Sequence, residues 1–66
     1  MEKEFILDSE YKLVRTDTGY IFKRSNQVIS MDDGALTNTL EWIKTFGRKY
    51  PGYLYNKQKQ YEHFTR

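Results

Sequence analysis

The sequence predicts a small α+β domain, in which an antiparallel sheet of three or four strands packs on one amphipathic helix. Two patterns carry this prediction. The first 31 residues alternate apolar and polar side chains between short turn-forming segments, which is the period of half-buried strands. From residue 32 onward the apolar residues recur every three or four positions, which is the period of a helix with one buried face. A chain of 66 residues without cysteine forms one domain at most, with neither a disulfide nor a thiolate zinc site to stabilise it.

The expected strands follow one another as a meander. Residues 5–7 form an apolar run that the turn formers of residues 8–10 close. Residues 11–15 and 20–24 alternate on either side of the hairpin loop Asp17-Thr18-Gly19, in which glycine can take a positive φ. Ser25-Asn26 offers a second turn, and residues 28–31 supply a further strand. Consecutive strands joined by such short turns predict antiparallel pairing throughout.

An amphipathic helix is expected to begin after Met31. Asp32 fits the N-cap and Asp33 the first turn, where carboxylates meet unpaired N–H groups and the positive end of the helix dipole. Met31 could pack on Leu36 as a hydrophobic staple. The expected buried stripe consists of Leu36, Leu40, Ile43, Phe46 and Tyr50. Gly47 fits the residue just past the helix end, although the pattern also allows the helix to run to Lys49, before Pro51.

The last residues fit no single period. Pro51 and Gly52 occupy the central positions expected of a type II turn between Tyr50 and Tyr53. Residues 53–55 then favour a short strand that closes the sheet, while residues 56–66 are either a short helix or disordered. We therefore predict a single α+β domain over residues 1–55, and a C-terminal tail over residues 56–66 that is packed on it or flexible.

Charge is distributed unevenly along the chain. Residues 44–66 carry six basic side chains against the single acid Glu62, whereas residues 1–43 carry five basic side chains against eight acidic ones. The basic segment also holds six of the eleven aromatic residues. A basic surface rich in tyrosine suits either a phosphate backbone or an acidic protein partner.

No residues form a recognisable catalytic or metal-binding pattern. Asp17-Thr18-Gly19 matches the tripeptide around an aspartic protease carboxylate, but there is one copy only, and a hairpin turn explains it. Asp32 and Asp33 lack the further oxygen ligands of a calcium site. His63 is the only imidazole, lies in a polar segment, and is expected to be solvated. We expect a protein that is not an enzyme and that has no cofactor and no metal.

The predicted partner-binding residues lie mainly in the basic segment. Cations there bracket tyrosines, so they could neutralise phosphates while the rings stack on unpaired bases. Packing of the same rings under the sheet is the competing interpretation. Trp42 lies on the shoulder of the helix stripe, where it either covers the edge of the core or anchors an interface. The set comprises Trp42, Arg48, Lys49, Tyr50, Tyr53, Tyr55, Lys57, Lys59 and Tyr61.

These features favour a small binding protein, a regulator or inhibitor that acts on a host or cognate protein, as is typical of proteins encoded by phages and mobile elements. The alternative is nucleic-acid binding through the basic segment. The element order resembles that of small β-ribbon DNA readers such as the arm-binding domains of integrases, although their sheet faces are more basic. A second alternative is a homo-oligomeric structural subunit, for instance a homodimer, using Trp42 and a sheet edge. The start Met1-Glu2-Lys3-Glu4-Phe5 has no secretory signal pattern and no apolar run approaches a membrane span, so we expect a cytoplasmic location without a membrane partner.

Overall fold

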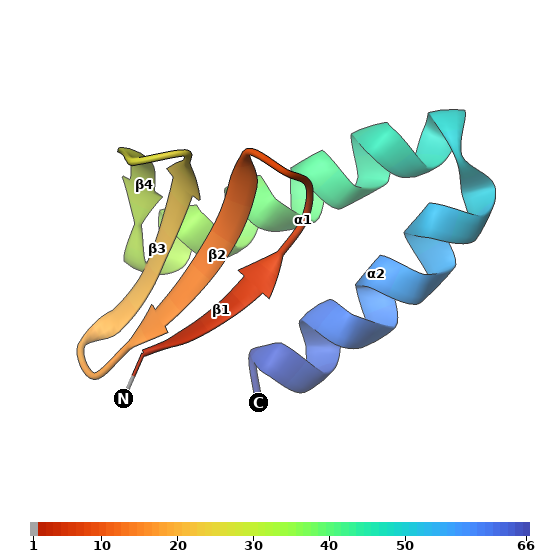
Figure 1. Ribbon diagram of the computed structural model, residues 1–66. Helices are drawn as coiled ribbons and strands as arrows, with labels where there is room; N and C mark the ends of the chain where they lie inside the picture. The colour runs from red at the N-terminus through yellow and green to blue at the C-terminus, as the bar shows by residue number, and fades with distance from the viewer. Residues whose placement is uncertain (1) are drawn as a thin grey trace.

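The computed structural model describes residues 2–66 and consists of four strands followed by two helices. The elements are β1 (Lys3–Ile6), β2 (Tyr11–Thr16), β3 (Gly19–Arg24), β4 (Gln27–Met31), α1 (Asp32–Lys49) and α2 (Pro51–Phe64). The strands form one sheet in the order β1-β2-β3-β4, and each neighbouring pair is antiparallel. The predicted α+β class and the antiparallel meander are confirmed (Figure 1).

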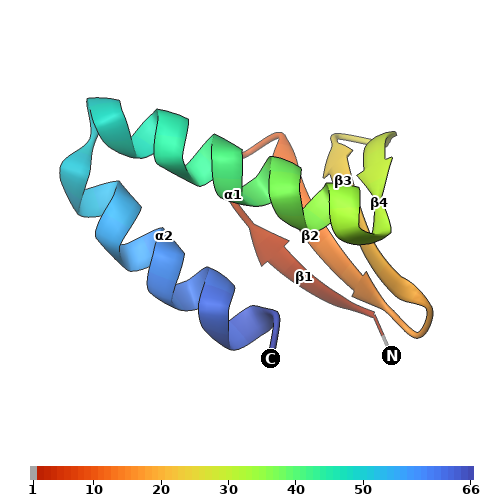
Figure 2. The ribbon, with the colours of Figure 1, turned by 180° about the vertical axis from the view of Figure 1, so that it is seen from behind.

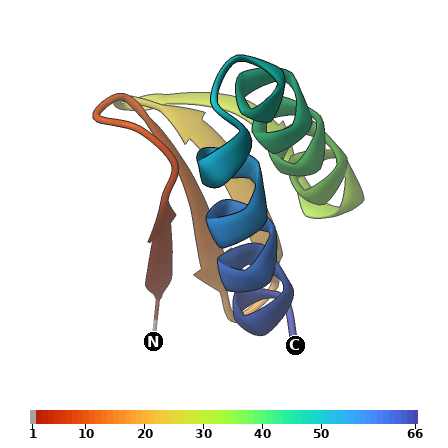
Figure 3. The same cartoon turned by 90° about the vertical axis from the view of Figure 1, so that its right-hand side faces the viewer.

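Both helices lie on the same side of the sheet. α1 crosses behind the strands in Figure 1 and in front of them in Figure 2, and α2 then turns back and passes alongside β1. The opposite face of the sheet has no helix over it (Figure 3). The protein therefore has two layers, and one side of its sheet is left open.

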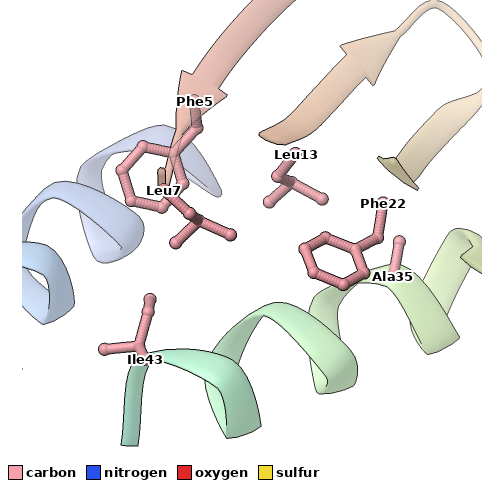
Figure 4. Packing of buried hydrophobic residues seen from close by; sticks show 6 residues of the cluster. All are labelled: Phe5, Leu7, Leu13, Phe22, Ala35 and Ile43. Carbon is pink, nitrogen blue, oxygen red and sulfur yellow. The ribbon is translucent and has the colours of Figure 1, made fainter. Parts of the chain in front are cut away.

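The core lies between the sheet and α1. Cross-strand pairing puts Phe5 opposite Leu13 and Leu13 opposite Phe22, so these three side chains form one row on the inner face. Leu7, Ala35 and Ile43 complete the buried cluster (Figure 4). Burial of a Leu, Ile or Phe side chain contributes roughly 1.5–3 kcal/mol, so this row and Ile43 supply much of the stability of a domain this small.

The start of α1 differs from the prediction. Met31 occupies the N-cap position without a side-chain hydrogen bond, and Asp32 is the first helical residue, with a φ of 54°. Met31 is 57% exposed and pairs with Ile21 on the outer face of the sheet, so the predicted staple with Leu36 is wrong. The physical reason is that β4 runs into α1 with no loop between them. The chain must reverse at Asp32 itself, and Asp tolerates a left-handed backbone better than most residues.

The buried stripe of α1 is rotated by about one residue from the predicted one. Its fully buried residues are Ala35, Thr39, Ile43 and Gly47, whereas Leu36, Leu40 and Phe46 are half-buried at its flanks. Gly47 does not end the helix, which continues to Lys49. A Cβ atom at Gly47 would overlap the side chain of Leu54 in α2. The glycine therefore allows the two helices to approach closely, which sequence periodicity alone could not show.

The segment after Tyr50 is helical from Pro51 onward. The predicted type II turn is instead the first turn of α2, in which the N–H groups of Tyr53 and Leu54 donate to the Tyr50 carbonyl at 2.9 and 3.3 Å. The predicted strand at residues 53–55 is wrong, because these residues belong to the same helix. Proline suits the first position of a helix, where its missing N–H costs nothing. α2 continues past residue 55, where the predicted domain ended, and includes most of the predicted tail of residues 56–66.

Candidate functional site

Trp42 belongs to an aromatic row that runs from the core toward the end of α1. Its ring stacks on that of Phe46 at 4.8 Å between centroids, and Tyr11 lies 5.4 Å away on the other side. The row continues from Phe46 to Tyr50 at 5.1 Å. Trp42 is half-buried and packs against the core cluster. Its contacts are those of a residue that covers the core edge, and Tyr50, 55% exposed, is the solvent end of the row.

Tyr53 and Tyr61 attach α2 to the rest of the protein. The Tyr53 hydroxyl donates to the Leu7 carbonyl at 2.7 Å, and the Tyr61 hydroxyl donates to the Leu36 carbonyl at 3.0 Å. Burial, and secondarily the negative charge of Asp8, raises the pKa of Tyr53 to about 12. Burial also raises the pKa of Tyr61. Both rings are engaged inside the fold, so neither is free to stack on a base.

Lys57 also makes contacts within the fold. Its Nζ donates to the Ile6 carbonyl at 2.8 Å and to the Gln60 side chain at 3.3 Å. The same ammonium lies 5.4 Å from the ring centre of Phe5 and 5.8 Å from that of Tyr53. Lys57 therefore attaches α2 to the end of β1, and its ammonium interacts there with a carbonyl and two aromatic rings.

Five residues of the predicted set remain at the surface. Arg48, Lys49 and Tyr50 end α1, and Tyr55 with Lys59 lies on the outer side of α2. Tyr55 is 62% exposed, and the Lys59 ammonium lies 4.8 Å from the centre of its ring. The exposed part of the predicted basic aromatic surface thus has two rings and three cations, which is smaller than the sequence suggested.

The outer face of the sheet is the surface that the sequence analysis missed. Ile6, Val28, Ile29 and Met31 are between 46% and 57% exposed there and at the adjoining edge strand β4. The pairing of β3 with β4 shifts between Phe22 and Lys23, which makes Ile29 an additional residue in β4. The missed signal is visible in the printed sequence: Leu13-Val14 and Ile21-Phe22 are adjacent apolar pairs, so these strands carry apolar side chains on both faces.

Two lysines lie within this surface, between Ile6 on β1 and Val28 on β4. Lys12 and Lys23 pair directly across β2 and β3. Glu4 neutralises Lys12 through an ion pair of 3.0 Å, whereas Lys23 has no ion pair within residues 2–66. Like charges directly opposite each other in a sheet are destabilising, so a carboxylate placed next to Lys23 would be favourable.

Residues suited to catalysis or metal binding do not come together. Over residues 2–66 no group of three or more His, Asp or Glu side chains is arranged to hold a metal ion. His63 is exposed on α2, and Asp17 lies at the tip of the β2–β3 hairpin. None of the helices in the described part of the chain is long and apolar enough to cross a membrane.

Comparison with protein-family models, with curated proteins and with solved structures finds no match to this chain.

Proposed function

We propose that the protein is a small non-enzymatic binding module that docks the open face of its sheet against an apolar surface of another protein, as a regulator or inhibitor. One observation carries this proposal: Ile6, Val28 and Met31 are each about half exposed, and strand register puts them on the face opposite the buried row of Phe5, Leu13 and Phe22. Neither helix covers that face (Figure 3). Exposed apolar residues that are scattered singly are normal in proteins, whereas contiguous ones mark interaction sites.

Strand register shows which apolar side chains on the outer face are neighbours. Ile21, which is half-buried, pairs with Met31, which puts two apolar side chains next to each other on β3 and β4. Val14 pairs with Ile21 from β2 but is only 5% exposed, so it adds little to this surface. Val28 lies in the next row, opposite Lys23. Covering this surface would remove apolar area from water at roughly 25 cal/mol per Å², which is the main favourable term in protein association.

The chemistry of the partner follows from the same face. Its centre must be apolar, to match Ile21, Val28 and Met31. It should also place a carboxylate opposite Lys23, because this cation has no ion pair within the described residues. Such a partner would cover the open face, so that the sheet would lie between the two helices and the partner.

Nucleic-acid binding is the second candidate. Exposed Arg48, Lys49 and Tyr50 at the junction of the helices, together with Tyr55 and Lys59, favour it. Stacking on an exposed ring contributes about 1–3 kcal/mol per base. The engagement of Tyr53, Lys57 and Tyr61 within the fold leaves fewer groups for a nucleic acid than the sequence indicated.

Affinity capture with three versions of the protein tests these proposals. Wild type, Val28→Thr/Met31→Thr and Lys49→Glu/Lys59→Glu are each used as bait in a lysate of the source organism treated with nuclease. The proposal expects a protein that wild type and the lysine variant retain and the sheet variant loses. Retention by the sheet variant would contradict it.

A parallel titration addresses the nucleic-acid candidate. Labelled single-stranded DNA and RNA are titrated at about 50 and 200 mM salt, a range over which several phosphate contacts should weaken binding strongly. Binding that is salt-sensitive and lost in Lys49→Glu/Lys59→Glu would favour this candidate over the first. The solution mass, compared with 8.0 kDa for one chain, tests the homo-oligomer alternative.

A further inference from the structure

We propose that the cleft between β1 and the C-terminal end of α2 is a binding site for an organic anion, a phosphate or carboxylate group carried on an apolar body. The cleft has a volume of about 410 Å³. This is within the range of roughly 300–1,000 Å³ that is usual for small-molecule sites. Its lining residues are Lys3, Phe5, Arg15, Gln60, His63, Phe64 and Arg66. The site is separate from the outer sheet face, because Lys3 and Arg15 share the inner face with Phe5 and Leu13.

Charge in the cleft has one sign. Among the lining side chains, Lys3, Arg15 and Arg66 are cationic, and no Asp or Glu side chain lines the cleft. None of these three side chains forms an ion pair with an Asp or Glu side chain in the described part of the chain. The net charge of the whole chain is only +2, so this local excess is considerable. A concave surface lined by one sign of charge concentrates ligands of the opposite sign.

Hydrogen bonds to the main chain position the Arg15 guanidinium in the cleft. Its Nη1 donates to the main-chain oxygens of Arg66 at 3.1 Å and Phe64 at 3.5 Å, at the negative end of the α2 dipole. The Nε and Nη2 groups make no hydrogen bond to the described residues. A positioned guanidinium with unused donors suits the paired oxygens of a carboxylate or phosphate.

The cleft also has an apolar wall. The rings of Phe5 and Phe64 stack at 5.6 Å between centroids with an interplanar angle of 29°. Phe5 is 6% exposed, so its ring is part of the core and does not move freely. An apolar wall beside these cations lets a ligand bury an apolar body while its anionic group meets Lys3, Arg15 or Arg66. The combination favours a ligand that has an aromatic or aliphatic body next to its anionic group over a bare inorganic anion.

Titration with small probes tests this site. Phenyl phosphate, benzoate, inorganic phosphate and benzyl alcohol are added at constant ionic strength and pH, and backbone amide shifts are followed by NMR. We expect saturable shifts at Phe5, Arg15 and Phe64 with phenyl phosphate or benzoate, at least tenfold tighter than with benzyl alcohol or inorganic phosphate. The tighter of the two aromatic anions identifies the preferred group. No saturable shift at these amides would overturn the proposal.

Two matched variants separate a specific site from general charge attraction. Lys3→Gln/Arg66→Gln removes one lysine and one arginine from the cleft, and Arg48→Gln/Lys49→Gln removes the same pair from the end of α1. All four side chains are exposed and make no side-chain hydrogen bond to the described residues, so both variants should fold. We expect at least a tenfold loss of affinity in the first variant and less than twofold in the second. An equal loss in both would overturn the proposal.

Discussion

Gly47 shows at the residue scale how close contact between helices limits what can be substituted. Glycine is usually unfavourable inside a helix by about 1 kcal/mol relative to alanine. Here the position faces Leu54 of α2, and even one added carbon would overlap that side chain. Gly34, in the same helix, is exposed, and a Cβ there would lie 3.6 Å from Ser30, an ordinary contact distance.

The two glycines should therefore respond to alanine in opposite directions. Gly47→Ala is expected to lower the free energy of unfolding by about 1–3 kcal/mol, because overpacking outweighs helix propensity. Gly34→Ala should raise it by up to about 1 kcal/mol. Urea unfolding of both variants measures these changes. If both substitutions stabilise the protein, the close approach of α1 and α2 at Gly47 is wrong.

The pKa of Tyr53 predicts a loss of stability in alkali. This pKa is raised to about 12 in the folded protein against 10.0 for an unperturbed tyrosine, so the unfolded chain releases its proton first as pH rises. The stabilising contribution is complete below pH 10, falls as pH rises through the interval to about 12, and is absent above it. Tyr61, whose pKa is also raised, adds to the same trend. Denaturant unfolding between pH 9 and 12 measures the decline.

A pair of phenylalanine substitutions identifies the source of this pH dependence. Tyr53→Phe should make the decline shallower, and it should cost about 0.5–1.5 kcal/mol at neutral pH by removing the hydrogen bond to Leu7. Tyr55→Phe changes an exposed ring and serves as the control. If stability declines in alkali as steeply in Tyr53→Phe as in the wild type, Tyr53 is not the source of the pH dependence.

At the scale of elements, α1 and α2 differ in how firmly they are held. α1 contributes Ala35, Thr39, Ile43 and Gly47 as buried residues, whereas α2 has none. The second helix is attached by half-buried side chains and by individual hydrogen bonds from Tyr53, Lys57 and Tyr61. Elements with few buried contacts open at lower free energies than the core.

This difference predicts local opening of α2 ahead of global unfolding. Amide hydrogens in residues 55–64 should exchange faster than those around Thr39 and Ile43, and their exchange should show weaker dependence on denaturant. Gly47→Ala should accelerate exchange in α2 more than elsewhere, because it disturbs the contact with Leu54. Equal protection in both helices of the wild type would show that they unfold as one unit.

At the scale of the whole molecule, the main feature is a sheet covered on one face only. The residues that make the outer face apolar are not needed for the core, which lies on the other side. Val28→Thr and Met31→Thr replace half-exposed side chains. Each should therefore change the free energy of unfolding by less than about 0.5 kcal/mol.

The same variants should have a clear effect on binding. If the outer face is an interaction surface, they should reduce the fluorescence of a dye that binds exposed apolar surface, and should weaken the complex with a protein partner. Chemical denaturation of each variant supplies the stability control. A loss of stability above about 2 kcal/mol would instead make the outer face part of the protein's own packing.

The sequence by itself determined the meander and the first helix. Alternation in residues 11–15 and 20–24, with glycine at the hairpin loop, specifies strand pairing locally, and the three-and-four spacing around Ile43 specifies a helix. It also identified the residues of the basic segment, although not which ones would be exposed. These features depend on neighbours a few positions apart, and short-range spacing carries that information.

Tertiary structure alone decided the remaining features. Only the close approach of α2 explains why residue 47 is a glycine inside a helix. Only the hydrogen bonds to Leu7, Ile6 and Leu36 show that Tyr53, Lys57 and Tyr61 attach α2 to the rest of the fold. The basic cleft joins Lys3 and Arg15 to His63 and Arg66 across nearly the whole length of the chain. The sheet has an open face because both helices pack on its other side. Such features arise because distant segments pack together, and spacing along the sequence does not encode that contact.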